Sequence, residues 1–211
     1  MFSSFSPNML KTYKDCPKRY YFRYVENIAM PQFISPFEKG KKIHALANYY
    51  LQGVNIDRLE KSLNVEEKGI WELLKSNEFY NKESFKSEFS LTSKVAQYWV
   101  GGRIDALVRD GDKYYILDYK TGTTPSNPEF DYQTMVYLLS VDKYLKRYSS
   151  LSFVYINLRD KNNYIIPFDT VIKRKYEEEI FNACERISSD NLYKCAKSNC
   201  KNCEYSKICE I

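Results

Sequence analysis

The stretch from Gly101 to Lys120 constrains the fold most, because it is typical of two strands joined by a tight turn. Gly-Gly-Arg-Ile-Asp at 101–105 and Tyr-Ile-Leu-Asp-Tyr-Lys at 115–120 flank Asp-Gly-Asp at 110–112. Asp-Gly between strand-like runs is a strong hairpin signal. A two-residue loop at 111–112 would place Asp105 directly opposite Asp118. A loop at 110–111 would shift the pairing by two residues and keep the same parity.

In either register the carboxylates of Asp105 and Asp118 are predicted to share one face of the hairpin, because side chains alternate with period 2. Lys120 lies two residues beyond Asp118 and joins them. Like charges that face each other destabilise a strand pair, and a cation between them reverses that effect. The pattern therefore predicts either a divalent-metal site beside an ammonium group or a different strand assignment.

The composition allows an anionic partner without requiring one. The 211 residues carry 32 basic and 27 acidic side chains, for a net charge of +5. The 20 Tyr and 12 Phe suit either a Tyr-rich core or base stacking in a nucleic-acid groove. No apolar run reaches the roughly 18 residues of a membrane span, and the N-terminus lacks the pattern of a signal peptide. We therefore expect a cytoplasmic protein without membrane association.

The N-terminal third is predicted to be helical. Ser6 and Pro7 resemble an N-cap and a first helical residue, and Pro17 should bend or restart the helix that follows. A turn-rich segment at 31–36 precedes the next helix, which carries the only histidine, His44. The predicted helices cover residues 8–24, 37–51 and 56–76.

The period changes to 2 from Ser84 onward, which indicates strands. Glu88 in the first of them has the position of an ordinary solvent-facing residue. In a later helix, Gln133 and Tyr137 are four residues apart and share a face. The predicted strands are 84–91, the two arms of the hairpin, 151–158 and 164–168, and the predicted helices are 130–145 and one from 169 or 170 to 188. This order indicates a mixed α/β sheet with an α-rich N-terminal region.

Three cysteines gather near the C-terminus, at Cys200, Cys203 and Cys209. A Cys-x2-Cys pair lets both sulfurs reach one centre, and six cysteines in a reducing compartment indicate metal or redox chemistry rather than disulfides. A lone helical cysteine is more often a buried small hydrophobe than a ligand. The candidates for a fourth ligand are Cys16, Cys195 and Cys184.

Seven motifs occur in a characteristic order along nearly the whole chain. They are Ser6-Pro through Cys16-Pro-Lys-Arg-Tyr-Tyr-Phe, Gly40-x3-His44, Glu88, Gly102-Arg-Ile-Asp105, Asp118-Tyr-Lys120-Thr-Gly, Gln133-x3-Tyr137 and Cys200-x2-Cys203-x5-Cys209. In this order they resemble the RecB-type branch of the PD-(D/E)xK nuclease superfamily. The resemblance is greatest to its iron–sulfur members, the CRISPR-associated Cas-four exonucleases and the AddB-type helicase–nuclease subunits.

The resemblance implies a single nuclease domain over 1–211 with a restriction-endonuclease-like core, in which helices flank a mixed central sheet. It implies a helical N-terminal region at 1–80, a nuclease core at 83–190 and a Cys-rich tail at 191–211 that is clasped to Cys16.

The resemblance also implies roles for individual residues. The implied catalytic residues are Asp105, Asp118, Lys120 and Glu88. The implied ligands of Mg²⁺ or Mn²⁺ are His44, Asp105, Asp118 and the backbone carbonyl of Tyr119. The residues expected to contact DNA are Gln133, Tyr137, Arg103, Lys41 and Lys42.

The second implied cofactor is a 4Fe–4S cluster that joins the two ends of the chain. Its ligands would be Cys16, Cys200, Cys203 and Cys209, which leaves Cys184 and Cys195 spare. Cys195 is near enough in sequence to compete as the fourth ligand. If the cluster is lost, these thiols could hold zinc or form disulfides instead.

The activity implied is metal-dependent hydrolysis of DNA, as an exonuclease on single-stranded ends with 5′-to-3′ polarity. The setting would be recombination, repair, replication or CRISPR adaptation, with partner proteins of those processes. One alternative is an endonuclease of the same fold that cuts structured or circular DNA. Another is a non-catalytic DNA-binding scaffold, against which the intact set of Asp105, Asp118 and Lys120 argues.

Overall fold

The computed structural model describes residues 4–30, 37–197 and 200–209. Its centre is a mixed six-stranded sheet with the order β1-β3-β4-β5-β6, in which β2 also pairs with β3. The strands are β1 Ser4–Phe5, β2 Glu83–Val95, β3 Tyr98–Asp110, β4 Lys113–Lys120, β5 Ser150–Asn157 and β6 Asn162–Phe168. The predicted mixed α/β architecture is confirmed.

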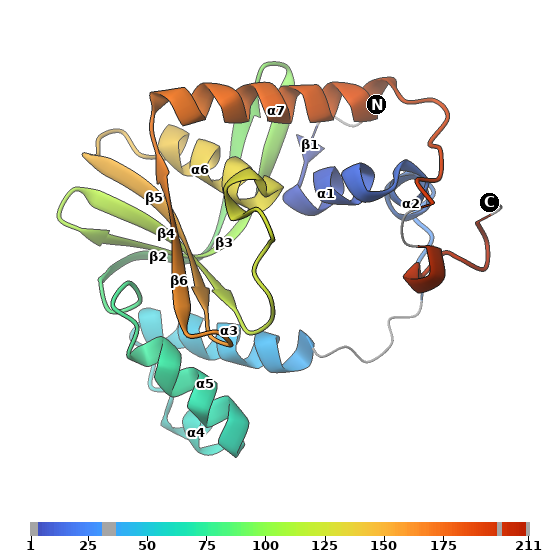
Figure 1. Ribbon diagram of the computed structural model, residues 1–211. Coiled ribbons are helices and arrows are strands. Elements are labelled where there is room, and N and C mark those ends of the chain that lie inside the picture. The colour runs from blue at the N-terminus through green and yellow to red at the C-terminus, as the bar shows by residue number, and fades with distance from the viewer. Residues whose placement is uncertain (1–3, 31–36, 198–199, 210–211) are drawn as a thin grey trace.

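Helices cover both faces of this sheet (Figure 1). They are α1 Pro7–Asp15, α2 Pro17–Tyr20 with a π-helical turn at Tyr21–Val25, α3 Phe37–Leu51, α4 Asp57–Lys61, α5 Val65–Lys75, α6 Tyr132–Tyr144 and α7 Thr170–Ser189. One hydrophobic core joins α1, α6 and α7 to the sheet, and a second joins α3 and α5 to the opposite face. None of the described helices has both the length and the apolar character that a membrane crossing requires.

The hairpin of β3 and β4 has the first of the two predicted registers. Asp110 pairs with Lys113 and Ala106 pairs with Leu117, so the loop consists of the two residues 111 and 112. Gly111 has a φ of +62°, a conformation that glycine adopts without steric cost. Turn chemistry therefore predicted the hairpin and its parity, and the structure selects between the two registers that it left open.

The two strands part where the acidic residues lie. The pairing of β3 with β4 stops at Ala106, and β1 pairs with the same strand only at Trp99 and Val100. Ile104 packs in the core of α6 and α7, whereas Ala106 packs in the core of α3 and α5. Residues two apart in a regular strand would share a face. The alternation therefore slips at Asp105, and the prediction that Asp105 shares a face with Asp118 and Lys120 was wrong on this point.

The predicted helix over 56–76 was also wrong, since it is divided into α4 and α5. Asn64 accepts a hydrogen bond from the backbone N–H of Glu67, and the Glu67 carboxylate accepts one from the N–H of Asn64. This capping box begins α5 as a new helix, whereas α4 already ends at Lys61. Strand β1 was not predicted, because two residues carry too little pattern.

The other predicted elements are present within a few residues. The Ser6 hydroxyl accepts a hydrogen bond from the N–H of Met9 and caps α1, and Pro17 restarts the chain as α2. Strand β2 is longer than predicted, with an irregularity between Ser84 and Lys86. The predicted turn segment at 31–36 lies outside the described residues.

Candidate functional site

Three potential metal ligands converge where β3 and β4 part. They are His44 on α3, Glu88 on β2 and Asp105 on β3, and one donor atom of each lies within 4.8 Å of the other two. Among the residues that the structure describes, this is the one group of three or more His, Cys, Asp or Glu side chains so placed. An imidazole and two carboxylates form a donor set suited to Mg²⁺ or Mn²⁺.

His44 is held from both sides. Its Nδ1 lies 3.1 Å from Oδ1 of Asp105, and its Nε2 lies 2.9 Å from the carbonyl oxygen of Tyr119. Because both partners are acceptors, both ring nitrogens donate. Burial lowers the pKa of His44, but the hydrogen bond and charge of Asp105 outweigh it and raise that pKa to about 9. Ligation by His44 would require the loss of one of these protons.

Glu88 has an unusual backbone for its residue type. Its φ is +45°, in the left-handed region that a non-glycine residue seldom adopts. Its neighbours Ser87 and Phe89 pair with Ala106 and Ile104, so Glu88 lies opposite Asp105. Backbone strain of this kind is common at functional sites, and here the Glu88 carboxylate lies near His44 and Asp105 rather than in the open solvent expected of an ordinary strand residue.

The Glu88 carboxylate also contacts a cation. Oε2 lies 2.8 Å from Nε of Arg103, whose side chain is 67% exposed. Burial raises the pKa of Glu88, with the charge of Asp105 acting in the same direction and Arg103 opposing both. Glu88 thus has a raised pKa beside a second carboxylate, an arrangement that a divalent cation would stabilise.

Asp118, Lys120 and Gln133 form the second half of the site. Asp118 is 3% exposed, and its Oδ2 lies 2.8 Å from Nζ of Lys120. Gln133 on α6 donates to Oδ1 of Asp118 and accepts from Lys120 at 3.2 Å. Burial raises the pKa of Asp118, the charge of Asp105 adds to the rise, and Lys120 opposes it. Gln133 therefore fixes the acid and the ammonium relative to each other.

Asp105 links the two halves. Its Oδ2 accepts a hydrogen bond from the backbone N–H of Tyr119 at 2.9 Å, and its Oδ1 faces His44. The side chain thus takes the place of the strand pairing that ends at Ala106. The carbonyl of Tyr119, expected as a ligand, lies beside His44 on the same side of the site.

The residues expected to contact DNA differ in how far their side chains are occupied by contacts within the protein. Tyr137 packs against Gly102, where an added Cβ would lie 2.9 Å from its ring, and its hydroxyl bonds to the backbone of Arg103. Lys42 is turned to Glu67 at 2.8 Å and to the carbonyl of Ser62. Lys41 is exposed on α3, one turn before His44.

One neighbour of the site was not found from the sequence. Lys120 Nζ lies 5.5 Å from the ring centroid of Tyr155 on β5. Tyr155 pairs with Asp118 across the parallel strands β4 and β5, a pairing that depends on the crossover through α6. No local pattern around Tyr155 signals this contact.

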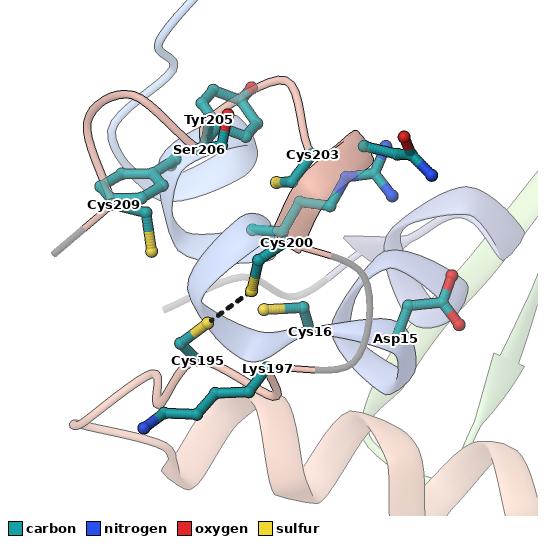
Figure 2. A pocket seen from close by; sticks show the side chains of 12 residues that line it. Asp15, Cys16, Cys195, Lys197, Cys200, Cys203, Tyr205, Ser206 and Cys209 are labelled. Atoms are coloured by element: carbon teal, nitrogen blue, oxygen red, sulfur yellow. Dashed lines mark hydrogen bonds between the residues drawn. The ribbon is translucent and has the colours of Figure 1, made fainter. Parts of the chain in front are cut away.

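The cysteines of the two chain ends line one cavity of about 280 Å³ (Figure 2). It contains Cys16 from the end of α1 together with Cys195, Cys200, Cys203 and Cys209 from the tail. Cys184 on α7 is instead fully buried in the hydrophobic core that joins α1, α6 and α7 to the sheet. Of the three candidates for a fourth ligand, Cys16 and Cys195 are therefore both in place and Cys184 is not.

Noncovalent contacts hold the tail against the N-terminal helices. Arg19 contacts both carboxylate oxygens of Glu204, at 3.0 Å each. The hydroxyl of Tyr205 donates to the carbonyl of Ile28 at 3.0 Å, and its ring packs against Phe22. Cys16 lines the same cavity as the tail cysteines, and the clasp of the tail to Cys16 stays a prediction.

Comparisons with known proteins agree with this geometry. The family model of the PD-(D/E)XK nuclease superfamily matches residues 4–210. The CRISPR-associated exonuclease Cas4 of Francisella tularensis subsp. novicida is 25% identical over 132 residues, which are 62% of this chain and 66% of that protein, just under two thirds of its length. A crystal structure of an exonuclease candidate from Eubacterium rectale has a similar fold, with a TM-score of 0.61 at 12% identity, over 99% of this chain and 89% of that one. The chain belongs to the PD-(D/E)XK nuclease superfamily.

Proposed function

We propose that this nuclease is a metal-dependent deoxyribonuclease that removes nucleotides from the ends of single-stranded DNA, with 5′-to-3′ polarity. The observation that supports it most is the convergence of His44, Glu88 and Asp105 beside the Asp118–Lys120 pair. The likeness to a CRISPR-associated exonuclease supports a preference for ends and a role in recombination, repair, replication or CRISPR adaptation.

The donor set fits Mg²⁺ or Mn²⁺. Carboxylate oxygens suit both ions, and the imidazole of His44 favours Mn²⁺ somewhat over Mg²⁺. We assign His44, Asp105, Asp118 and the Tyr119 carbonyl as ligands, with Glu88 on a second ion or a metal-bound water. When bound, such an ion lowers the pKa of a water molecule and polarises the scissile phosphate.

Lys120 supplies positive charge at the phosphate. Its ammonium is held between Asp118 and Gln133 at the edge of the site, at 2.8 and 3.2 Å. A cation fixed in this way needs little reorganisation when negative charge develops on the phosphate oxygens. Gln133 is thus a positioning residue for Lys120 and Asp118.

The strand of DNA would be held mainly through its backbone. Arg103, which contacts Glu88, and Lys41, one turn before His44 on α3, are both exposed and suit phosphate contacts. Lys42 is already paired with Glu67, so we assign phosphate binding to Lys41 rather than to its neighbour.

A 4Fe–4S cluster on Cys16, Cys200, Cys203 and Cys209 is the second part of the proposal. A single zinc ion would hold its thiolates about 3.8 Å apart, given Zn–S bonds of about 2.3 Å. No three of the cysteine sulfurs, all of which the structure describes, lie within 4.8 Å of one another. They surround a cavity instead, which suits a group larger than one ion.

The test is a cleavage assay on end-labelled linear single strands with Mn²⁺, with Mg²⁺ and with EDTA. Asp118→Ala and Lys120→Ala should lose cleavage and keep most DNA binding, whereas Lys113→Ala at the far end of β4 should behave as wild type. Metal-dependent activity that persists in Asp118→Ala would overturn the assignment. Cleavage of circular single strands would identify an endonuclease, and binding without cleavage would identify a scaffold.

A further inference from the structure

Cys195 has no role in the proposed cluster, yet it lines the same cavity as the four assigned ligands. Its thiol is in hydrogen-bonding contact with that of Cys200. Figure 2 shows its sulfur pointing toward that of Cys200 across the cavity. A fifth thiol therefore lies among the sulfurs that we assign to the cluster.

The distance between two of these sulfurs is short. Sγ of Cys195 and Sγ of Cys200 are 3.7 Å apart, and four residues separate the two cysteines in sequence. A disulfide bond is about 2.05 Å long, so the sulfurs need to approach by about 1.7 Å, a movement that side-chain rotation can supply. Both side chains are partly exposed, so a small oxidant can reach them.

The same pair is poorly suited to a single metal ion. Among the described residues, no third His, Cys, Asp or Glu donor lies within 4.8 Å of both sulfurs. A mononuclear soft-metal site needs three or four such donors around one point. Two close thiols without a third ligand form instead the arrangement from which a disulfide arises.

We propose that Cys195 and Cys200 are an oxidation site that forms a disulfide with hydrogen peroxide when the cavity is empty. One thiolate attacks the O–O bond and becomes a sulfenic acid while hydroxide leaves. The second thiolate attacks that sulfur, the S–S bond forms, and the second hydroxide leaves. In sum, two thiols lose two protons and two electrons, and one peroxide is reduced to two waters.

The consequence for the cofactor rests on the proposed cluster. A disulfide at Cys200 removes one of the four assigned ligands, so oxidised protein could not accept iron and sulfide until a reductant restored the thiol. Cys195 would thus determine whether protein that has lost its cluster and been oxidised can take up iron and sulfide again.

The first experiment maps the disulfide in the full chain. Protein that has been stripped of metal and reduced is treated with hydrogen peroxide, alkylated and digested with trypsin. Each cysteine of the tail then lies in a separate peptide, because trypsin cleaves after Lys194, Lys197, Lys201 and Lys207. Mass spectrometry should detect peptide 195–197 linked to peptide 198–201. Alkylated Cys195, or a linkage of Cys200 to Cys203 instead, would overturn the proposal.

Two variants sharpen the result. Cys195→Ser should leave Cys200 free for alkylation after peroxide, whereas Cys184→Ser, outside the cavity, should form the same linked peptide as wild type. Any variant that fails to fold is recognised by its circular dichroism. The mapping in wild type needs no variant, so the proposal can be tested even if both substitutions destabilise the chain.

The second experiment separates this proposal from that of the cluster. Iron and acid-labile sulfide are measured after reconstitution of reduced and of peroxide-treated protein. We expect loading of reduced wild type, loss of loading after peroxide, and retention of loading in peroxide-treated Cys195→Ser. If reduced wild type takes up no iron, the cluster assignment fails while the mapped disulfide stands. Equal loading of oxidised and reduced wild type would overturn the proposed consequence.

Discussion

Each carboxylate of the candidate site lies against a cationic side chain of the chain itself. The pairs are Arg103 with Glu88, His44 with Asp105 and Lys120 with Asp118. A divalent ion would add two positive charges to a site already compensated in this way, so its binding favours the departure of a cation. Arg103 is the best placed to leave, since its side chain is 67% exposed whereas that of His44 is 28% exposed. Once released, its guanidinium can bind a phosphate through two parallel hydrogen bonds.

This argument predicts two opposite effects of Arg103→Ala. The variant should need less Mn²⁺ for half-maximal cleavage, because no guanidinium competes for Glu88. It should also have a higher KM for single-stranded DNA, with a salt slope smaller by about one, because one phosphate contact is lost. Metal titrations and KM measurements at several salt concentrations provide both readouts.

Arg109→Ala is the matched control for that substitution. Arg109 lies on the same strand and pairs with Glu83 on β2, at one end of the ladder that has Arg103 in its middle. Arg109→Ala should change neither the Mn²⁺ requirement nor the KM for single-stranded DNA. An Arg103 variant with unchanged metal requirement and unchanged KM would exclude both roles.

At the residue scale, local pattern predicted part of the site. The proximity of Asp118 and Lys120 follows from strand period alone. The proximity of Glu88 to Asp105 could not be predicted in this way, because it depends on the left-handed backbone of Glu88 and on the slip of alternation at Asp105. Both irregularities depend on tertiary packing, which cannot be predicted from the pattern of neighbouring residues.

At the scale of elements, the β2–β3 ladder depends on a close backbone approach at Gly101. A Cβ there would overlap the carbonyl oxygen of Leu91 and lie 2.9 Å from Cα of Thr92. Both are atoms of the neighbouring strand, which cannot move without breaking the pairing that holds Glu88 opposite Asp105. Glycine is therefore needed at position 101 because the backbone of β2 leaves no room for a Cβ, and not because of its own φ.

Gly101→Ala should accordingly lower the free energy of unfolding by about 1–3 kcal/mol or more, as overpacking against fixed atoms does. Gly69→Ala is the matched control, since Gly69 is exposed within α5 and its added Cβ meets nothing within 4 Å. In a helix interior that change should stabilise the fold by about 0.5–1 kcal/mol. Chemical denaturation of both variants measures the difference, and equal effects would contradict the packing argument.

The elements themselves were predictable to the extent that their signals are local. The hairpin and the parity of its pairing follow from the Asp-Gly turn, and the start of α1 follows from Ser6 and Pro7. The division between α4 and α5 was missed because Asn64 resembles an ordinary polar helix residue until its reciprocal bonds with Glu67 are seen. Strand β1 exists only through its parallel pairing with β3.

At the scale of the whole molecule, the C-terminal tail packs against the N-terminal helices, and a series of contacts leads from there to the candidate site. The tail contacts α2 through Glu204 and Arg19. Helix α1, in turn, contacts the start of α6, where Lys11 lies 3.6 Å from Asp131. Asp131 caps α6 by accepting from the backbone N–H of Gln133, the residue that holds Lys120. The closure of the ends and the position of Gln133 are therefore connected by a continuous series of contacts.

The Arg19–Glu204 contact offers a direct test of this closure. Both side chains are about one-third exposed, at 33% and 30%, so the pair should contribute on the order of 1 kcal/mol, as expected of a bidentate ion pair only partly shielded from water. Arg19→Glu and Glu204→Arg should each release the tail, and the lysine-specific protease Lys-C, which does not cut at the introduced arginine, should then cleave after Lys201 and Lys207 several times faster, in proportion to the open population.

The double variant Arg19→Glu with Glu204→Arg decides whether the contact itself holds the tail. The swapped charges can pair again, so cleavage should slow toward the wild-type rate and the coupling between the two substitutions should be non-additive. The fraction of the tail that is open should also determine DNA cleavage, if the series of contacts through α1 positions Gln133. If the rate increase of the double variant with Lys-C is the product of the two single increases, the tail is held by its other contacts, those of Tyr205 and the cysteines.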